Sequence, residues 1–405
     1  MTSEGRVSQS RMEESEHQPV RAATDFLVFG APLIGPEEKA AVLDCLETGW
    51  IGTGPKVHQF ESEFGAYLGA RHAVAVHSCT AALHLSMLAA GVGPGDEVIT
   101  TPLTFCATVN AIIHTGATPV LADVDPQTMN IDPGQVRARV NTDTRAIVPV
   151  HFAGRCCDMK ALNGVVADRD ILLIEDCAHA IETTYEGRHT GTFGAMGCYS
   201  FYSTKNLTTG EGGMIVTEDE VLAARLRVLA LHGLSRDAWK RFSVEGYQHY
   251  QAIETGFKYN MMDLQAALGI HQLRRLESNW ARRRQVWERY LDAFATAPLE
   301  LPVPSEANTR HAYHLFTVLI DPAVAGISRD DFLAAITREN IGVGVHYQSV
   351  PVHPVYRERY GWHPEDYPHS HRIGEQTVSL PLSAKLTDRD VNDVIHAVRK
   401  VLRVI

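Results

Sequence analysis

Short apolar runs alternate with helical stretches through the first half of the chain, and this alternation constrains the fold more than any other feature of the sequence. The runs AVAVH, DEVITT, TPVLADVD, AIVPVHFAG and ILLIEDCA are separated by segments in which apolar residues recur at helical spacing. Such a rhythm predicts an α/β fold in which a largely parallel sheet is covered by helices on both faces. Parallel sheets bind ligands at the carboxyl ends of their strands. We therefore expect the functional site in the loops after Val76, Ile99, Val124, Val150 and Ile174.

The sequence pattern divides the 405 residues into four parts. Residues 1–23 are polar and charged with little to bury, which predicts a disordered tail. Residues 24–260 contain the βα rhythm and are expected to form a large domain. Residues 261–295 keep helical spacing for longer than an ordinary globular helix does, which predicts a helix that links two domains. Residues 296–405 have a β-α-β-α pattern, with one strand expected at GVGVHY, and predict a small C-terminal α+β domain.

Two segments of the large domain have distinct expectations of their own. The run PEEKAAVLDCLETG, which begins at Pro36, predicts a short helix that ends at Gly49. Its apolar residues fall on one helical face: Ala40, Val42, Leu43 and Leu46. The polar stretch from residue 234 to residue 256 predicts a long surface loop.

The charge balance argues against two classes of partner. Lysine and arginine number 37 against 48 aspartates and glutamates, a net charge of −11, so the chain repels nucleic acid and anionic membranes. Five arginines nevertheless gather in the segment expected to link the domains: Arg274, Arg275, Arg282, Arg283 and Arg284. We expect them to form a solvated face paired with Glu277 and Glu288 rather than a nucleic-acid site.

The cysteines and the absence of targeting signals indicate in which cellular compartment the protein is expected. Seven cysteines are an odd number without zinc-ligand spacing, which predicts reduced packing residues and no metal site. The N-terminus has no signal-peptide pattern, and no apolar run approaches the about 18 residues that a membrane span needs. The sequence therefore predicts a soluble, cytoplasmic protein.

The segment IEDCAHAIETTYEGRHTGTFGAMGCYSFYSTKNLTTGEGG contains the two most informative residues. Asp176 ends a buried strand, where a carboxylate is costly unless it has a cationic partner. A protonated pyridine nitrogen is such a partner, and holding that proton makes pyridoxal phosphate (PLP) an electron sink. Lys205 precedes a glycine-rich run, and a lysine in a confined site can have a lowered pKa and form a Schiff base. Either residue alone fits a helix cap or a solvated lysine better, but together with the βα rhythm they predict a PLP site.

Other residues suit the phosphate and the ring of such a cofactor. The run HSCTAALHLSM places four residues at the start of a helix directly after a strand: Ser78, Cys79, Thr80 and Ala81. Free amides and a hydroxyl at a helix N-terminus bind a phosphate dianion, although Thr80 could instead only cap its helix. Ser200 could add a second hydroxyl. Phe105 lies at a strand-to-helix turn, where an aromatic ring either stacks on a planar cofactor or packs in the core.

These motifs, in this order, resemble the DegT/StrS family of PLP-dependent sugar aminotransferases from about Phe26 to the C-terminus. The matching stretches are GWIGTGPKVHQFESEF, HSCTAALH, GPGDEVITTPLTFCATVNAI, PVHFAG, IEDCAHA, SFYSTKNLTTGEGG, GFKYNMMDLQAALGIHQL and GVHYQSVPVHPVY. The family has the fold-type-I architecture of aspartate aminotransferase, so the resemblance implies a large, mostly parallel-sheet domain and a small C-terminal α+β domain. The chain looks most like the branch that aminates 4-keto nucleotide sugars, whose aminoarabinose member has similar GWIxTGPK, HGLxxDAW and GYKYN stretches.

The resemblance implies a role for each matching residue. Lys205 would form the internal aldimine and move protons, and Asp176 would pair with the pyridine nitrogen. Phe105 would stack on one face of the ring. His179, where many relatives have Gln, would cover the opposite face or contact the ring hydroxyl.

The same resemblance extends to the phosphate, the partner subunit and the substrate. The cofactor phosphate would be held by Thr80, Ala81 and Ser200. Asn260 would reach that phosphate from a neighbouring subunit, which implies a homodimer with shared active sites. Thr53 and His346 would lie near the sugar nucleotide.

The implied reaction transfers the amino group of glutamate to an NDP-4-keto-6-deoxyhexose or a 4-keto-pentose. Family dehydratases have His at the position of Lys205, so the lysine favours transamination. A diphosphate substrate needs a basic pocket in this acidic chain, and Lys258 and Arg284 are candidates for it. Two alternatives stay open: a keto-cyclitol aminotransferase of antibiotic biosynthesis and a PLP-binding regulator without catalysis.

Overall fold

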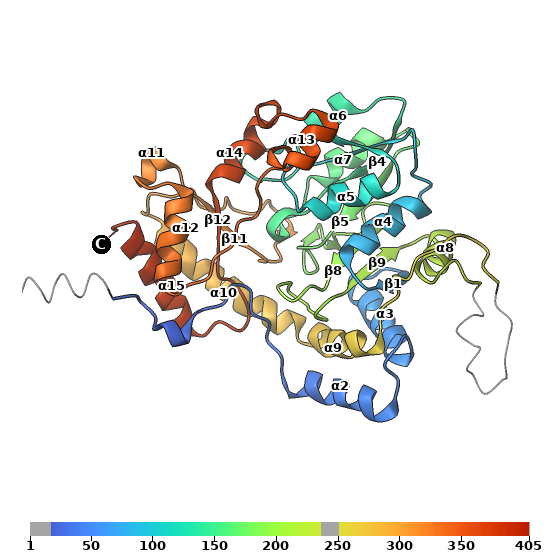
Figure 1. Ribbon diagram of the computed structural model, residues 1–405, viewed down its shortest axis with the longest axis horizontal. Helices are drawn as coiled ribbons and strands as arrows, with labels where there is room; N and C mark the ends of the chain where they lie inside the picture. The colour runs from blue at the N-terminus through green and yellow to red at the C-terminus, as the bar shows by residue number, and fades with distance from the viewer. Residues whose placement is uncertain (1–17, 236–250, 405) are drawn as a thin grey trace, which may run out of the picture.

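The computed structural model describes residues 18–235 and 251–404, which form a large domain and a smaller one beside it (Figure 1). Residues 1–17, which make up most of the predicted tail, lie outside the described residues. So do residues 236–250 of the predicted surface loop.

The large domain is built on a seven-stranded sheet with the strand order β1-β9-β8-β5-β4-β2-β3. In chain order the strands are β1 (His72–Val76), β2 (Glu97–Thr100), β3 (Thr118–Leu121), β4 (Thr144–Val148), β5 (Leu172–Asp176), β8 (Met196–Ser200) and β9 (Gly213–Thr217). The five strands from β3 to β8 are parallel, and β9 runs antiparallel to both of its neighbours. The predicted largely parallel sheet is confirmed.

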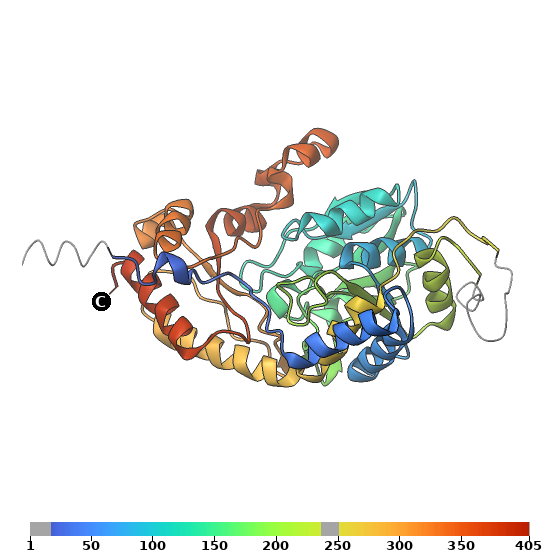
Figure 2. The same cartoon turned by 60° about the horizontal axis from the view of Figure 1, so that its bottom comes forward.

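Helices cover both faces of this sheet (Figure 2). One face packs against α4 (Cys79–Ala89), α5 (Cys106–His114) and α8 (Glu220–Ala230). The other packs against α3 (Pro55–Leu68), α6 (Pro133–Arg139), α7 (Met159–Val166) and α9 (Asp263–Arg274). The alternation along β1 explains this layering, because Val74 and Val76 pack with α4 whereas Ala73 and Ala75 pack with α3. Both faces of the strand are buried, so the strand reads as a continuous apolar run.

The small domain packs an antiparallel pair of strands, β11 (Phe316–Leu319) and β12 (Thr377–Leu380), among helices. The helices of its core are α10 (Leu276–Phe294), α12 (Arg329–Arg338) and α15 (Asp388–Val401). The remaining helices of the described chain are α2 (Pro36–Thr48), α11 (Pro322–Ala325), α13 (Pro354–Tyr360), α14 (Pro368–Gln376) and the 3-10 turns η1 (Ala23–Asp25), η2 (Phe152–Gly154), η4 (Val350–Val352) and η5 (Pro364–Asp366). The short strands β6 (Thr184–Tyr185), β7 (Arg188–His189) and β10 (Thr309–Arg310) form a separate sheet.

The prediction of a strand at GVGVHY, residues 342–347, is wrong. This segment makes one isolated bridge, from Gly344 to Ser379, and the strand that pairs with β11 is β12. Both glycines of the segment are approached too closely for a side chain. A Cβ on Gly342 would lie 2.9 Å from the carbonyl oxygen of Leu27, and one on Gly344 would lie 2.7 Å from the ring of His346. Close packing of the backbone, rather than strand pairing, explains the glycines.

The segment predicted as one linking helix forms two helices. α9 and α10 meet at Arg275, whose backbone angles of φ −103° and ψ 4° lie outside the helical range. The side chain of Arg275 bonds to the carboxylate of Glu38 on α2, 2.6 Å away. Each helix then packs in the core of its own domain, since α9 contributes to the large one and α10 to the small one.

The arginines of this segment are not one solvated face. Arg284 pairs with Glu288 at 2.8 Å on the surface, as predicted. Arg283 contradicts the prediction, because it is 2% exposed and pairs with the fully buried Glu182. Other pairs are Arg274 with Glu63, Arg275 with Glu38, and Arg310 with Glu277.

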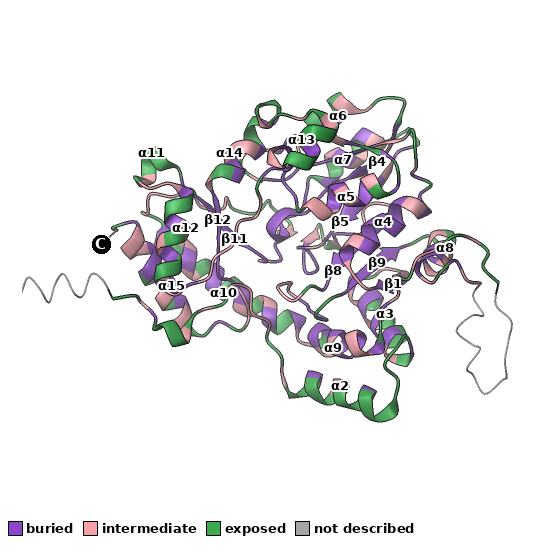
Figure 3. Ribbon diagram, viewed as in Figure 1, coloured by how far each residue is buried: buried purple, intermediate pink, exposed green. Residues whose placement is uncertain are grey.

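The N-terminal part of the chain also departs from expectation. Arg21, within the predicted tail, is 5% exposed and donates to Asp390 and Asp393 of α15 at 2.7 and 2.8 Å. The predicted helix at residue 36 is confirmed as α2, and Figure 3 shows most of this helix in the colour of exposed residues. Leu43 and Leu46 on its apolar face remain more than half exposed in the single chain.

The structure also bears on the expected role of the cysteines and on the expected absence of a membrane span. All seven cysteines are free thiols, in agreement with the predicted packing role. Within residues 18–235 and 251–404, no helix has the length and apolarity that a membrane span requires.

Candidate active site

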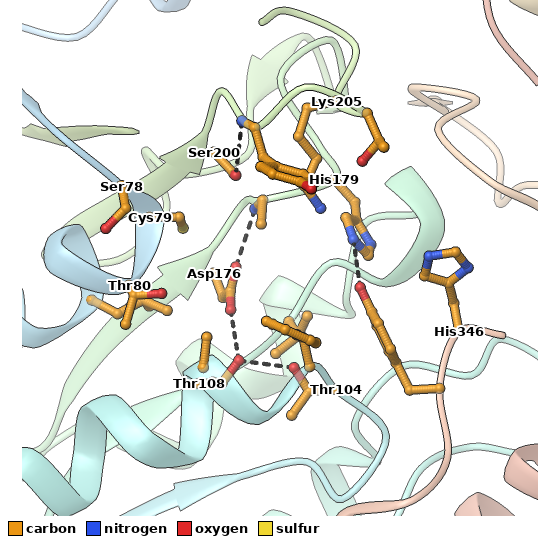
Figure 4. Close-up of a pocket in the computed structure, with 18 of the residues that line it drawn as sticks. Ser78, Cys79, Thr80, Thr104, Thr108, Asp176, His179, Ser200, Lys205 and His346 are labelled. Atoms are coloured by element: carbon orange, nitrogen blue, oxygen red, sulfur yellow. Dashed lines mark hydrogen bonds between the residues drawn. The ribbon is translucent and has the colours of Figure 1, made fainter. Parts of the chain in front are cut away.

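A cavity of about 580 Å³ lies at the carboxyl ends of the parallel strands, where the sequence predicts a ligand site (Figure 4). Its volume is within the usual range for cofactor and substrate sites. The first turns of α4 and α5, the ends of β5 and β8 and the loop after β8 form its walls. Of the predicted site residues, the cavity brings together Thr80, Phe105, Asp176, His179, Ser200, Lys205 and His346.

Asp176 ends β5 with its carboxylate buried beneath the cavity. Oδ2 accepts a hydrogen bond from the hydroxyl of Thr108 at 2.9 Å, and Oδ1 accepts one from the N–H of Ala178 at 3.1 Å. Burial raises the pKa of Asp176, while these two hydrogen bonds and the charge of Lys205 oppose the shift. Within the described residues the carboxylate has no ion-pair partner at salt-bridge distance, so a cationic ligand group beside it would be strongly stabilised.

Lys205 follows β8 in a tight turn, in which its N–H donates to the carbonyl of Tyr202 at 2.9 Å. Burial lowers the pKa of the Lys205 amine to about 8, against the opposing effects of Cys79 and Asp176. A fraction of this amine is unprotonated near neutral pH. The unprotonated amine is the form that attacks a carbonyl carbon.

The end of β5 is fixed from below by Glu175. The carboxylate of Glu175 is fully buried and lies 3.0 Å from Nε2 of His151. It also accepts hydrogen bonds of 2.7 Å from the N–H groups of Gly191 and Gly194. His151, Glu175 and Cys177 lie close enough together to hold a metal ion. However, both carboxylate oxygens already have donors, so this cluster is better suited to holding the strand end in place.

The first turn of α4 forms the end of the cavity that suits a phosphate. Ser78 is the N-cap, because its hydroxyl accepts a hydrogen bond from the N–H of Ala81 at 3.1 Å. The alternative that Thr80 caps the helix is therefore wrong, and Thr80 lines the cavity together with Ser200. Gly213 of β9 lies against this turn so closely that a Cβ there would be 2.5 Å from the carbonyl carbon of Ser78. Close packing thus fixes a helix N-terminus and two hydroxyls at one end of the cavity.

Aromatic rings border the middle of the cavity. Phe105, the N-cap residue of α5, is 59% exposed, so its ring is available to a ligand. His179 is buried, and its Nδ1 accepts a hydrogen bond from the N–H of Ala153 at 3.2 Å. A neutral His179 therefore carries its proton on Nε2, which lies 3.0 Å from the hydroxyl of Tyr347. Burial lowers the pKa of His179 well below its usual range, which keeps the ring neutral.

His346 enters the cavity from the small domain. Its Nδ1 lies 2.9 Å from the hydroxyl of Ser379, and its ring packs 5.5 Å from the ring of Phe29. Burial lowers the pKa of His346 to about 4, with a further contribution from Lys205. His346 is therefore a neutral hydrogen-bonding group at physiological pH.

Ala81, whose N–H donates to the hydroxyl of Ser78, does not line the cavity. Three other predicted residues lie outside it in a hydrogen-bonded row on the surface. The amide of Asn260 donates to the hydroxyl of Thr53 at 2.6 Å, and this hydroxyl donates to the carbonyl of Met261 at 2.6 Å. Nζ of Lys258 donates to Oδ1 of Asn260 at 2.6 Å. The row does not line the cavity of its own chain.

The sequence analysis missed two residues of the site, Thr108 and Tyr347. Thr108 lies one helical turn after Thr104, and the two hydroxyls are 2.8 Å apart. Two threonines at that spacing in the turn that follows a strand are a usable signal for a polar helix face. Tyr347 follows His346 directly, but the strand expected at GVGVHY drew no attention to its hydroxyl.

The residues present fit PLP. Asp176 offers a buried carboxylate to a protonated ring nitrogen, and Lys205 offers an amine of lowered pKa to an aldehyde. The N-terminus of α4 suits a phosphate. Phe105 and His179 line the cavity between these ends with flat rings.

Comparison with known proteins gives a consistent picture. The family model of the DegT/DnrJ/EryC1/StrS aminotransferase family matches residues 32–399. The spore coat polysaccharide biosynthesis protein SpsC of Bacillus subtilis is 49% identical over 385 residues, which cover 95% of this chain and 99% of SpsC.

Solved structures agree with this assignment. An inferred sugar aminotransferase from Streptococcus pneumoniae, in its PMP form, superposes with a TM-score of 0.87 at 30% identity and covers 94% of this chain and 100% of its own. The same protein is also known in a PLP form. The aminotransferase TlmJ from Streptoalloteichus hindustanus has a TM-score of 0.85 at 35% identity, over 93% of this chain and 99% of its own. The chain therefore belongs to the DegT/DnrJ/EryC1/StrS aminotransferase family and is a PLP-dependent sugar aminotransferase.

Proposed function

We propose that this enzyme transfers the amino group of glutamate to the keto carbon of a nucleotide-linked sugar, either an NDP-4-keto-6-deoxyhexose or a 4-keto-pentose. The observation that supports amino transfer most is the meeting of Lys205 and Asp176 in one cavity. The kinship with SpsC, a spore coat polysaccharide biosynthesis protein, favours a sugar that is destined for a polysaccharide. A cytoplasmic location stays a prediction.

Lys205 is the group that moves protons in this proposal. Its amine, with a pKa of about 8, is basic enough to remove the α-proton of the donor amino acid near neutral pH. The same amine, once protonated, returns a proton to the sugar carbon that receives nitrogen. PLP, when bound, supplies the electron sink for both half-reactions. Asp176 keeps a proton on the ring nitrogen, and the hydroxyl of Thr108 keeps Asp176 in place.

The remaining cavity residues bind and orient. The N-terminus of α4, with Thr80 and Ser200, holds the cofactor phosphate. Phe105 would stack on one face of the cofactor ring, and His179 would cover the opposite face or contact the ring hydroxyl. His346, held neutral, donates or accepts a hydrogen bond at the sugar.

We also propose a homodimer in which each copy completes the other's site. Four apolar side chains near the row of Thr53, Asn260 and Lys258 are half exposed or more: Leu43, Leu46, Trp50 and Ile51. Covering the exposed half of one such side chain contributes about 1 kcal/mol. A second copy would cover this patch and receive the row at its cavity, where Lys258 would meet the diphosphate.

The test begins from the enzyme loaded with the amine form of the cofactor. Nucleotide-linked 3-keto and 4-keto sugars, a keto-cyclitol and a free keto-sugar are added separately, and the return of the visible absorbance of the aldehyde form is followed. We expect a return with a nucleotide-linked 4-keto sugar and no comparable rate with the free sugar. A faster return with the keto-cyclitol contradicts the proposed acceptor. No return with any acceptor, together with no 2-oxoglutarate from glutamate, contradicts catalysis and favours a regulator.

A further inference from the structure

Behind the wall of the cavity, a polar network of three buried side chains and the partly buried Asn206 joins segments that are far apart in the sequence. Its members are Glu182 after β5, Asn206 after Lys205, Arg283 on α10 and His314 before β11. None of these four residues lines the main cavity. Glu182 is fully buried, Arg283 is 2% exposed and His314 is 6% exposed.

Asn206 is the residue at which the network converges. Its amide nitrogen donates to Oε2 of Glu182 at 2.9 Å and to the carbonyl of Ala312 at 3.1 Å. Both of these partners can only accept, so the –NH2 group of the amide must face them. The amide oxygen therefore faces Nδ1 of His314, 2.9 Å away, and this nitrogen must carry the proton. All three hydrogen bonds of the Asn206 side chain are thus fixed in direction by their partners.

The network connects the charged side chains of Arg283 and Glu182 to the loop that contains Lys205. Oε1 of Glu182 accepts a hydrogen bond from the guanidinium of Arg283, and Oε2 accepts the one from Asn206. A buried carboxylate with donors on both oxygens is costly to move, because displacing it leaves a charge without partners. Asn206 is bonded covalently to Lys205, so the anchored amide limits where the lysine backbone can lie.

The other end of the network lies behind the cofactor wall. The ring of His314 packs against the ring of His179, with centroids 4.4 Å apart and a tilt of 34°. Burial lowers the pKa values of both histidines well below their usual range, so neither ring repels the other by charge. Through His314, the amide of Asn206 is therefore connected to the imidazole that lines the cavity.

We propose that Asn206 is a positioning residue. Its hydrogen bonds to the buried Glu182–Arg283 pair and to His314 fix the position of Lys205 relative to His179 in the cavity wall. This inference rests on the proposed role of Lys205 as the lysine that bonds to PLP. That bond forms between the amine and the aldehyde carbon with loss of one water molecule. Loss of the Asn206 anchor lowers the effective concentration of the amine at the aldehyde carbon, while the phosphate end and Asp176 stay intact.

The experiment compares two cofactor forms on one protein. Pyridoxamine phosphate has no aldehyde and makes no bond to Lys205, whereas PLP does. The dissociation constants of both forms are measured for the full-length apoenzyme and its variants, and their ratio reports the contribution of Lys205. In Asn206→Leu we expect PLP affinity to fall about tenfold relative to pyridoxamine phosphate. A ratio equal to that of the wild type overturns the proposal, whatever happens to the individual affinities.

The chain contains a closely matched control in Gln272 on α9. Its amide also donates to a fully buried carboxylate, that of Glu38 at 2.7 Å, and to a carbonyl, that of Leu33 at 2.8 Å. The carboxylate of Glu38 is likewise paired with an arginine, Arg275. Gln272→Leu should lose similar stability but keep the wild-type ratio. An equal change of the ratio in both variants overturns a specific role of Asn206.

Two more variants complete the test. Lys205→Ala must abolish the preference for PLP, and a preference that survives in this variant refutes the role of Lys205 itself rather than that of Asn206. If Asn206→Leu does not fold, His314→Phe keeps a ring against His179 but removes the donor to Asn206. We expect this variant to shift the ratio in the same direction by a smaller factor, and an unchanged ratio in it overturns the proposal.

Discussion

Asp176 and Lys205 line the cavity, where their charged forms lower the folding stability of the protein without a ligand. Burial raises the pKa of Asp176 and lowers the pKa of Lys205 to about 8. Each shift means that the charged form is less favourable here than in water. A ligand with a ring cation and an aldehyde relieves both costs at once, which connects the electrostatics of these two residues to the use of PLP.

The pKa of Lys205 predicts how PLP capture depends on pH. The attacking amine must be unprotonated, and with a pKa of about 8 about one tenth of it is in that form at pH 7. We expect the rate of PLP capture by the apoenzyme to rise with pH and to level off above pH 8. Stopped-flow absorbance measures this rate, and an N-acetyl-lysine amide provides the reference. A rise centred near pH 10.5, as for the free amine, contradicts the lowered pKa.

Asp176→Asn should affect stability and activity in opposite directions. A carboxyl whose pKa is raised by folding lowers stability as pH rises above its unfolded value of 3.8. The variant apoenzyme should therefore melt about 1–3 °C higher at pH 7 and show no gain below pH 3.8. Its kcat should fall at least about 100-fold, because the ring nitrogen loses its charged partner. Near-normal turnover contradicts the role of Asp176 at the ring nitrogen, and a lower melting temperature at pH 7 contradicts the cost of its burial.

The residues that the sequence revealed are those with a local signal. Asp176 ends an apolar strand and Lys205 precedes a glycine-rich run, so each could be found from its neighbours. Thr108 and Tyr347 act through distant partners, Asp176 and His179, and nothing next to them in the sequence marks those contacts. Asn206 is similar, because its three partners come from other parts of the chain.

At the scale of elements, the phosphate end depends on how β9 packs against α4. Gly213 lies in β9, and its Cα faces the turn at Ser78 and Cys79. A Cβ at this position would lie 2.7 Å from the N–H nitrogen of Cys79, within the turn that is proposed to hold the phosphate. The strand therefore sets the position of the helix N-terminus.

Gly213→Ala is expected to push the first turn of α4 out of place. Overpacking at a buried contact costs about 1–3 kcal/mol of unfolding free energy, and PLP affinity should fall about tenfold or more. Gly164→Ala is a suitable control, because Gly164 lies in α7 with no atom within 4 Å of its Cβ position. That control should gain up to about 1 kcal/mol from helix propensity. Unchanged PLP binding by Gly213→Ala, measured by equilibrium dialysis, would falsify this packing account.

Helices and strands with a clear apolar pattern were predicted well from the sequence. Elements whose ends or pairing depend on tertiary contacts were not. Four of the five parallel strands, β2 to β5, follow directly from apolar runs between helical stretches. The break between α9 and α10 has no glycine or proline to mark it, and the residue at the break, Arg275, contacts the distant Glu38. The short GVGVHY run has the composition of a strand, but the backbone of the N-terminal segment occupies its edge.

At the scale of the whole molecule, one chain leaves its proposed site incomplete. The sequence analysis assigned Thr53 and Asn260 to the site, and both lie on the surface beside exposed apolar residues of α2 and the loop that follows. The apolar face of α2 was identified from its helical period, but its exposure in a single chain could not be foreseen. The proposed second copy would account for both the exposed face and the displaced polar row.

Complementation between two variants, each of which lacks one residue of the proposed site, tests this account most directly. Lys205→Ala and Asn260→Ala are co-expressed with different tags, and the mixed dimer is isolated through both tags. If Asn260 serves the cavity of a second copy, the mixed dimer contains one site with Lys205 and an intact Asn260 from the other chain. We expect it to show about half of the wild-type kcat per dimer, since one of two sites is complete. If Asn260 serves its own chain, the mixed dimer contains no complete site, and activity no higher than the sum of the two single variants contradicts the account.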